Sequence, residues 1–170
     1  AILSLNAGAA KGRFAHDTGE GSISEHHRRH GGDLIWEIGS GYFGCRNDDG
    51  SFNADRFTAN ACDPQVKMIE IKLSQGAKPG LGGVLPAAKI TEEISAIRGV
   101  PQNRDCISPA AHPEFHDVDS LLDFVERIAD ATGLPVGIKS AIGEPNIWSD
   151  LAEAMVSGER GVDFITVDGG

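Results

Sequence analysis

The sequence predicts an α/β fold, a partial (β/α)8 barrel of the TIM type whose parallel strands carry a long glycine-rich loop after the central strand. Three observations support this prediction. After residue 90, short apolar runs alternate with helical patterns, which is typical of parallel βα units. Residues 69–74 resemble a strand and open directly into a loop that contains Gly76, Gly80, Gly82 and Gly83. A complete barrel needs roughly 250 residues and this chain has 170. We therefore expect a single fragment of a barrel domain, residues 1–170, truncated at both ends.

The first third of the chain predicts a helix, a turn and a strand. Residues 1–8 are mostly good helix formers, and we expect the helix to end at Gly8. Residues 18–21 form a turn with one carboxylate, Glu20. Residues 34–38 are a mostly buried strand that runs into the small residues Ser40 and Gly41. A strand that ends this way can present its backbone to a flat ring, so Ser40 and Gly41 are candidates for contact with an aromatic cofactor.

The central strand and its loop predict a site. Ile69, Ile71 and Leu73 alternate with polar residues, as in a β-strand. The loop that follows is costly in chain entropy, so it more often serves a site than a mere connection. Gln75 and Lys78 lie where the strand opens into this loop. In an α/β barrel, that end of a strand faces the active site.

The second half of the chain begins with a short helix and a rigid loop. Thr91 is a suitable N-cap for a helix over residues 91–98, which carries acids in its first turn. Arg98 ends that helix, where a cation interacts favourably with the helix dipole. Residues 108–116 form a loop that two prolines fix.

Two further helix–strand units complete the chain. Residues 120–132 predict an amphipathic helix closed by Gly133, followed by a strand over 135–139 that ends with Lys139. A helix over about residues 147–156 precedes a strand over 162–167, which leads into Asp168, Gly169 and Gly170. Because these are successive parallel strands, we expect Lys139 and the final glycines at the same end of the sheet.

Composition excludes several classes of protein. The chain has 25 acidic and 15 basic residues, a net charge of −10, which argues against nucleic acid as a partner. No apolar run approaches the roughly 20 residues of a membrane helix, and no secretory leader is visible. The three cysteines are isolated and lack the spacing of zinc or iron–sulfur ligands. We interpret them as reduced thiols and expect a cytoplasmic protein.

We predict no metal site from the histidines. His26 and His30 have the i, i+4 spacing of helical metal ligands, but two adjacent arginines disfavour a dication and no further ligand has suitable spacing. Pro113 makes a regular helix through His112 and His116 unfavourable. Residues 47–50 lack the ligand spacing of a calcium loop and are interpreted as a turn.

Six segments, in a common order and at compatible spacings, carry a resemblance to a known family. They are Thr18-Gly-Glu-Gly21, Ser40-Gly-Tyr-Phe-Gly44, the loop Gln75-Gly-Ala-Lys-Pro-Gly80 with Gly82, Gly83, Leu85 and Pro86, Ser108-Pro109 with His112, Val136-Gly-Ile-Lys139, and Asp168-Gly-Gly170. Together they resemble the FMN-binding domain of glutamate synthases and of shorter glutamate-synthase-like flavoproteins. The resemblance spans nearly the whole chain.

This resemblance implies roles for particular residues. Ser40, Gly41 and Gln75 would contact the flavin, and Lys139 would stabilise negative charge on the reduced ring. Asp168, Gly169 and Gly170 would begin the cradle of the FMN phosphate. Lys78 would be the leading substrate anchor, supported by Glu20, Arg98 and Ser108. The alternatives are that Glu20 is an exposed turn residue, Arg98 only a helix-end cation and Lys139 an exposed strand-end charge.

The family reaction is the FMN-dependent reductive amination of 2-oxoglutarate to glutamate, with ammonia or glutamine-derived ammonia. An iron–sulfur cluster in the parent protein would come from residues outside this stretch. Leu81 and Val84 replace a Glu and a Gln that are typical of the family loop, and a different FMN-dependent oxidoreductase is therefore the first alternative. The second is an inactive structural module that forms homo-oligomers through uncovered strand edges. We expect the 170 residues alone to be inactive, and the electron donor stays open.

Overall fold

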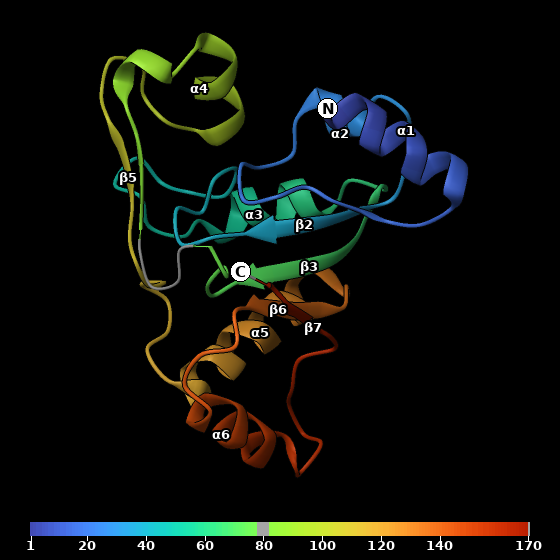
Figure 1. Cartoon of the computed structure of the whole chain (residues 1–170), viewed down its shortest axis with the longest axis vertical. Coiled ribbons are helices and arrows are strands. Elements are labelled where there is room, and N and C mark those ends of the chain that lie inside the picture. The colour runs from blue at the N-terminus through green and yellow to red at the C-terminus, as the bar shows by residue number, and fades with distance from the viewer. Residues whose placement is uncertain (78–81, 170) are drawn as a thin grey trace.

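The computed structural model, described over residues 1–77 and 82–169, contains one curled parallel sheet with helices on both sides (Figure 1). The five strands are ordered β1-β2-β3-β6-β7 and every neighbouring pair is parallel. Their bounds are His16–Asp17, Leu34–Ile38, Val66–Lys72, Val136–Ser140 and Ile165–Val167. This half-barrel confirms the predicted fold class. Lys78, Leu81 and Gly170 lie outside the described residues.

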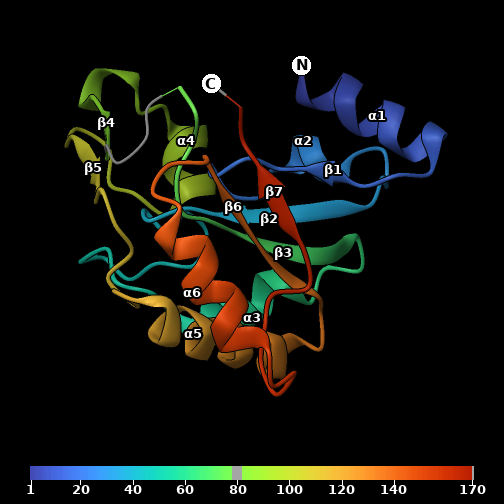
Figure 2. The same cartoon turned by 60° about the horizontal axis from the view of Figure 1, so that its bottom comes forward.

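One face of the sheet forms the main hydrophobic core. Trp36, Ile38, Ile69, Ile71 and Ile138 are at most 1% exposed and pack against three helices. These helices are α3 (Ala54–Ala61), α5 (Val118–Thr132) and α6 (Asn146–Met155), which lie together on one side of the sheet (Figure 2). Because side chains alternate along a strand, the residues between these apolar positions face the opposite, concave side.

Two predicted helices of the second half begin with side-chain caps and are confirmed. Asp117 caps α5 by accepting from the Ser120 amide, and Gly133 closes the helix with φ 68°. Thr91 likewise caps α4 (Glu92–Arg98) by accepting from the Ile94 amide. The predicted Thr91 cap is therefore confirmed, and α5 begins two residues before the predicted start at residue 120.

The first helix is longer than predicted. It spans α1, Ile2–Gly12, and Arg13 ends it in the left-handed region with φ 56°. Gly8 lies inside the helix, so the prediction that it ends there is wrong. Ala9, Ala10 and Lys11 follow it, and their helix propensity offsets the roughly 1 kcal/mol cost of one internal glycine.

A small antiparallel pair was not predicted. β4 (Gly83–Leu85) pairs with β5 (Cys106–Ser108), and a 3-10 helix η1 (Ala87–Lys89) and α4 connect them. Phe43, Ile90, Val100 and Cys106 form a second, smaller core beneath this unit. The pair holds the loop after β3 against the loop after β5. Within the described residues, no helix has the length and apolar character needed to cross a membrane.

Candidate functional site

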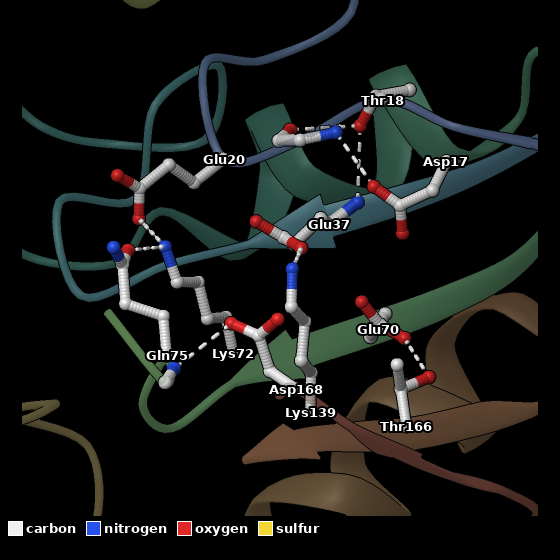
Figure 3. Close-up of polar contacts among 12 residues, drawn as sticks. Asp17, Thr18, Glu20, Glu37, Glu70, Lys72, Gln75, Lys139, Thr166 and Asp168 are labelled. Carbon is white, nitrogen blue, oxygen red and sulfur yellow. Dashed lines mark hydrogen bonds and ion pairs between the residues drawn. The ribbon is translucent and has the colours of Figure 1, made fainter. Parts of the chain in front are cut away.

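Charged side chains line the concave side of the sheet near the carboxyl ends of its strands. Glu37 on β2 lies opposite Glu70 on β3, and Lys72 on β3 lies opposite Lys139 on β6 (Figure 3). Carboxyl ends of parallel strands share one edge of a barrel, where active sites are found. The register therefore brings residues from distant segments to one surface.

Lys72 is the centre of a small polar pocket. Its ammonium donates to Glu20 Oε2 at 3.0 Å and to Gln75 Oε1 at 2.6 Å. The pocket, about 50 Å³, is also lined by Ser40 and Ser108. Four residues that the sequence predicts as separate site residues, Glu20, Ser40, Gln75 and Ser108, thus meet around Lys72. Lys72 is not among the site residues that the sequence predicts. An alternating strand pattern marks it only as a polar position and does not show that this position faces the site.

Gly41 matters because a side chain there would displace the pocket wall. A Cβ at Gly41 would lie 2.7 Å from Ser108 Oγ and 2.9 Å from the Phe43 ring. Ser40 Oγ donates to the Pro109 carbonyl at 2.6 Å, which ties the loop after β2 to the loop after β5. A side chain at residue 41 would therefore push Ser108 and the loop after β5 away from the loop after β2.

His112 fixes the same loop to the end of β3. Its Nε2 lies 2.8 Å from the Lys72 carbonyl, so Nε2 carries the proton and Nδ1 accepts from Tyr42 Oη at 3.0 Å. Burial lowers the pKa of His112. The hydrogen bond to the Lys72 carbonyl favours the imidazolium cation and raises the pKa, but burial has the larger effect. His112 is therefore a neutral positioning residue beside Lys72, a role that the sequence did not reveal.

Lys139 pairs with a buried carboxylate. Its ammonium lies 2.9 Å from Glu37 Oε2, and Glu37 is 2% exposed. Burial lowers the pKa of Lys139, but the hydrogen bond and charge of Glu37 outweigh this and the pKa is raised above its ordinary value. Lys139 is thus a permanent cation, and the alternative of a freely exposed strand-end charge does not fit its 22% exposure.

Asp168 ties the end of the last strand to the glycine-rich loop. Its Oδ2 accepts from the Gly76 amide at 3.1 Å, and its own amide donates to the Ser140 carbonyl at 3.0 Å. Gly169 follows it at the surface, with no atom within 4 Å of where a Cβ would lie. Asp168, Lys139 and the Gln75 segment are therefore neighbours, as Figure 3 shows.

Arg98 lies outside the Lys72 pocket. Its guanidinium lies over the Phe43 ring, 4.8 Å from the centroid, and close to Gly21. Arg98 and Glu20 line a different cavity of about 530 Å³. Glu20 therefore stands between the two cavities, while the predicted anchor Lys78 falls outside the described residues.

Three carboxylates converge deeper on the concave face. Asp17, Glu37 and Glu70 each place an oxygen within 4.8 Å of the others. Glu70 is 2% exposed, Oε1 accepts from the Thr166 hydroxyl, and Oε2 has no hydrogen-bond partner among the residues that the structure describes. Burial, together with the charges of Asp17 and Glu37, raises the pKa of Glu70 to about 7. Such a set can hold a hard cation or share a proton. The ammonium of Lys139 already pairs with Glu37, which favours the proton.

The histidines of the first third are engaged locally. The helix α2 ends at Arg28 (Glu25–Arg28), so His26 and His30 do not share one regular helix. His26 Nε2 lies 2.6 Å from Glu93 Oε1 on α4. His27 accepts from the Ser24 amide at 3.0 Å.

Comparison with known proteins identifies relatives along the whole chain. Residues 1–170 match the family model described as a conserved region in glutamate synthase. The chain is 40% identical over 153 residues to the glutamate synthase large subunit-like protein YerD of Bacillus subtilis. That alignment covers 90% of this chain and 29% of YerD. It is 36% identical over 171 residues to an archaeal-type glutamate synthase (NADPH) of Thermotoga neapolitana, and 31% identical over 173 residues to an archaeal glutamate synthase (NADPH) of Archaeoglobus fulgidus. Each of these two alignments covers 99% of this chain and 30% of the relative. The chain therefore spans about three tenths of the length of these curated relatives.

Proposed function

The chain belongs to the glutamate synthase family, and from this premise we propose that it supplies part of the FMN and substrate sites of an enzyme that reductively aminates 2-oxoglutarate to glutamate. The observation that carries the proposal is the Lys72 pocket. Glu20, Ser40, Gln75 and Ser108 come from four separate segments and line one cavity with a lysine. A lysine beside hydroxyl and amide groups suits one carboxylate group of a substrate, which is what about 50 Å³ accommodates, and Glu20 adds an acceptor next to it.

The described residues fit a flavin whose ring becomes anionic on reduction. Lys139 is held cationic by Glu37 and lies one strand away from Lys72 in register. Gln75 offers an amide beside Lys72, and Gly169 leaves open space at the end of β7. Bound FMN would supply the hydride that converts the imine of 2-oxoglutarate to glutamate. Further contacts with the flavin would come from Ser40 and Gly41. The cradle of the FMN phosphate would begin with Asp168, Gly169 and Gly170.

The protein's share of the reaction is orientation and charge. Lys72 would exchange its contact with Gln75 for a substrate carboxylate, and Ser108 would donate a second hydrogen bond. Glu20 already accepts a hydrogen bond from Lys72. It would orient ammonia by accepting a second hydrogen bond, from an N–H of the ammonia. Arg98 would act as a more distant cation from the cavity that it shares with Glu20. Lys78 stays the proposed anchor from the glycine-rich loop, outside the described residues.

The alternative of a different FMN-dependent oxidoreductase rests on Leu81 and Val84. Val84 is 65% exposed and is absent from the lining of the Lys72 pocket, whereas its neighbour Gly83 lines it. Successive side chains of a strand point to opposite faces, so Val84 points away from that pocket. The replacement of Gln by Val at this position therefore removes no polar group from the Lys72 pocket.

The structural-module alternative draws on exposed apolar residues along the edge strand. Ile165 and Val167 on β7 are 44% and 58% exposed, which favours association through this edge. Sedimentation of the isolated chain would show concentration-dependent association under this alternative and a single monomeric species otherwise.

The proposed function is tested with the purified full-length protein. It is incubated with 2-oxoglutarate, a reductant, and either ammonia or glutamine, and glutamate is quantified. NADPH is the first electron donor to try, because it appears in the names of the Thermotoga and Archaeoglobus relatives. Glutamate formation supports the proposal. A flavin-loaded protein that forms none from either nitrogen source favours the other oxidoreductase.

A further inference from the structure

A second cavity, separate from the Lys72 pocket, is rich in arginine. It has a volume of about 450 Å³ and lies among α2, α3 and the carboxyl end of α4. Arg28, Arg46, Arg56 and Arg98 line it, four of the nine arginines in a chain with a net charge of −10. We call it the arginine pocket. None of these four residues lines the Lys72 pocket.

The positive charge of the arginine pocket is largely uncompensated. Arg28 donates to Asp63, but no carboxylate within residues 1–77 and 82–169 forms an ion pair with Arg46, Arg56 or Arg98. Glu25 lines the pocket without pairing with any of them. Gathering like charges without a counterion is unfavourable, so the pocket attracts anions.

The arginines are held by neutral groups that leave N–H donors free. Arg46 donates to the Gly41 carbonyl at 3.1 Å, and Arg56 donates to the Arg46 carbonyl at 2.6 Å. Arg46 and Arg98 lie over the same Phe43 ring, with guanidinium carbons 5.7 and 4.8 Å from its centroid. Each guanidinium has five N–H donors, so donors remain on each of the three for a ligand.

The floor of the arginine pocket adds polar groups. Ser22 is 3% exposed, lines the cavity, and has a left-handed backbone with φ 75°. A Cβ at the facing Gly44 would lie 2.0 Å from Ser22 Oγ, so glycine leaves room for that hydroxyl. Ile97 and Ala59 give the cavity apolar walls. A charged centre with partly apolar walls is the usual form of a small-molecule site, and its volume is within the usual range.

We propose that the arginine pocket binds the phosphoryl group of a small phosphorylated metabolite. Arg46 from the loop after β2, Arg56 from α3 and Arg98 from α4 border the same cavity, and guanidinium groups are the preferred partners of phosphate oxygens. A volume of about 450 Å³ also accommodates a small organic group. The site is independent of the flavin, because none of the residues that we propose as flavin contacts lines it.

The test uses inorganic phosphate as the probe. It is titrated into the purified protein at constant ionic strength, with and without saturating FMN, so that phosphate bound at a flavin site is separable, and binding is followed by calorimetry. Arg56→Gln removes an exposed arginine of the pocket and is expected to weaken phosphate binding about tenfold. Arg29→Gln, the matched control, removes the same charge next to Arg28 outside the pocket and is expected to leave the affinity unchanged.

Arg56→Lys is prepared beside these variants. It keeps the charge but loses the planar fork, so an intermediate affinity is expected, and it serves in place of Arg56→Gln if that variant fails to fold. The proposal is overturned if phosphate does not saturate a site, or if Arg29→Gln weakens binding as much as Arg56→Gln. It is also overturned if 2-oxoglutarate displaces phosphate competitively, because the cavity would then belong to the substrate site. Failure of FMN binding leaves all of these measurements intact.

Discussion

Lys139 and Glu37 form an ion pair of 2.9 Å that joins β6 to β2 across the central strand β3. The two residues are 102 positions apart in the sequence. Their pairing orients the cation that we assign to the flavin, and both residues lie on the concave side of the sheet, opposite the hydrophobic core.

The two members of this pair should respond differently to substitution. Lys139→Met leaves the Glu37 carboxylate buried without its partner, which should cost about 3 kcal/mol of unfolding free energy. Glu37→Gln leaves a lysine that is 22% exposed and can reach water, so its cost should be smaller, about 1 kcal/mol. Urea unfolding of both variants and of the double variant checks this order. A larger cost for Glu37→Gln would contradict the assignment of the carboxylate as the more buried partner.

Stability should fall as pH rises from about 4.5 to about 7, because of Glu70. Its pKa in the folded protein is raised to about 7, first by burial and then by the charges of Asp17 and Glu37. Between the pKa of Glu70 in the unfolded chain and about pH 7, the folded state binds more protons than the unfolded state. The stability that the protonated Glu70 contributes is therefore fully present below this pH range and is lost as the pH rises through it. The loss is on the order of 3 kcal/mol. Lys139 and Thr166 also contact the three carboxylates and bear on the size of this effect.

Glu70→Gln isolates this effect. The amide has the shape of the protonated carboxyl and carries no charge, so the variant should fold and should lose less stability than the parent between about pH 5 and pH 8. Urea midpoints at both pH values measure the difference. If the variant kept the full pH dependence, Glu70 would not be its source. A gain in stability of the parent with Mg²⁺ or Ca²⁺ would instead identify the three carboxylates as a cation site.

Replacing either of two glycines by alanine should change the stability of the protein in opposite directions. Gly41→Ala would force Ser108 and the Phe43 ring aside and should destabilise the protein by about 1–3 kcal/mol. Gly8→Ala places a methyl group in open space inside α1 and should stabilise by about 0.5–1 kcal/mol. Thermal unfolding of the two variants side by side is sufficient. Similar losses in both would show that residue 41 is not specially confined.

Lys72 at the end of β3 should be required for substrate binding, whereas Lys67 near the start of the same strand should not. Lys72→Met removes the cation of the pocket and should lower kcat/KM for 2-oxoglutarate about 100-fold in the full-length enzyme. Lys67→Met removes a half-exposed lysine from the same strand, which pairs only distantly with Asp33, at 3.9 Å, and should have little effect. Steady-state kinetics of both variants distinguish the roles. Equal losses would indicate that charge on β3 acts nonspecifically.

Periodicity and capping predicted much of the fold. The buried run 34–38 matches β2, and the predicted Thr91 cap begins α4. The amphipathic pattern located α5 but missed its Asp117 cap, because the cap lies before the apolar repeat begins. The β4–β5 pair escaped prediction because each strand has three residues and is stabilised by long-range contacts rather than by its own pattern. β7 begins at Ile165 rather than at residue 162, although the Asp163 amide already donates to the Val136 carbonyl.

The site was only partly visible in the sequence for a physical reason. Loop residues such as Glu20, Gln75 and Ser108 stand out because their neighbours are glycine and proline. Lys72 and Glu70 sit within a strand whose alternation is typical of a sheet with one solvated face. In a barrel that second face lines the interior, so Glu70 is 2% exposed. Only the register of β2, β3 and β6 reveals that these charges meet.

The central claim is that the carboxyl ends of these strands bind FMN beside a carboxylate pocket. Visible absorption of the purified full-length protein, titrated with FMN and then with 2-oxoglutarate, tests it most directly. We predict a flavin spectrum that saturates at about one FMN per chain, shifts when 2-oxoglutarate is added, and loses that shift in Lys72→Met while keeping it in Lys67→Met. A colourless protein whose addition leaves the spectrum of free FMN unchanged would contradict the account.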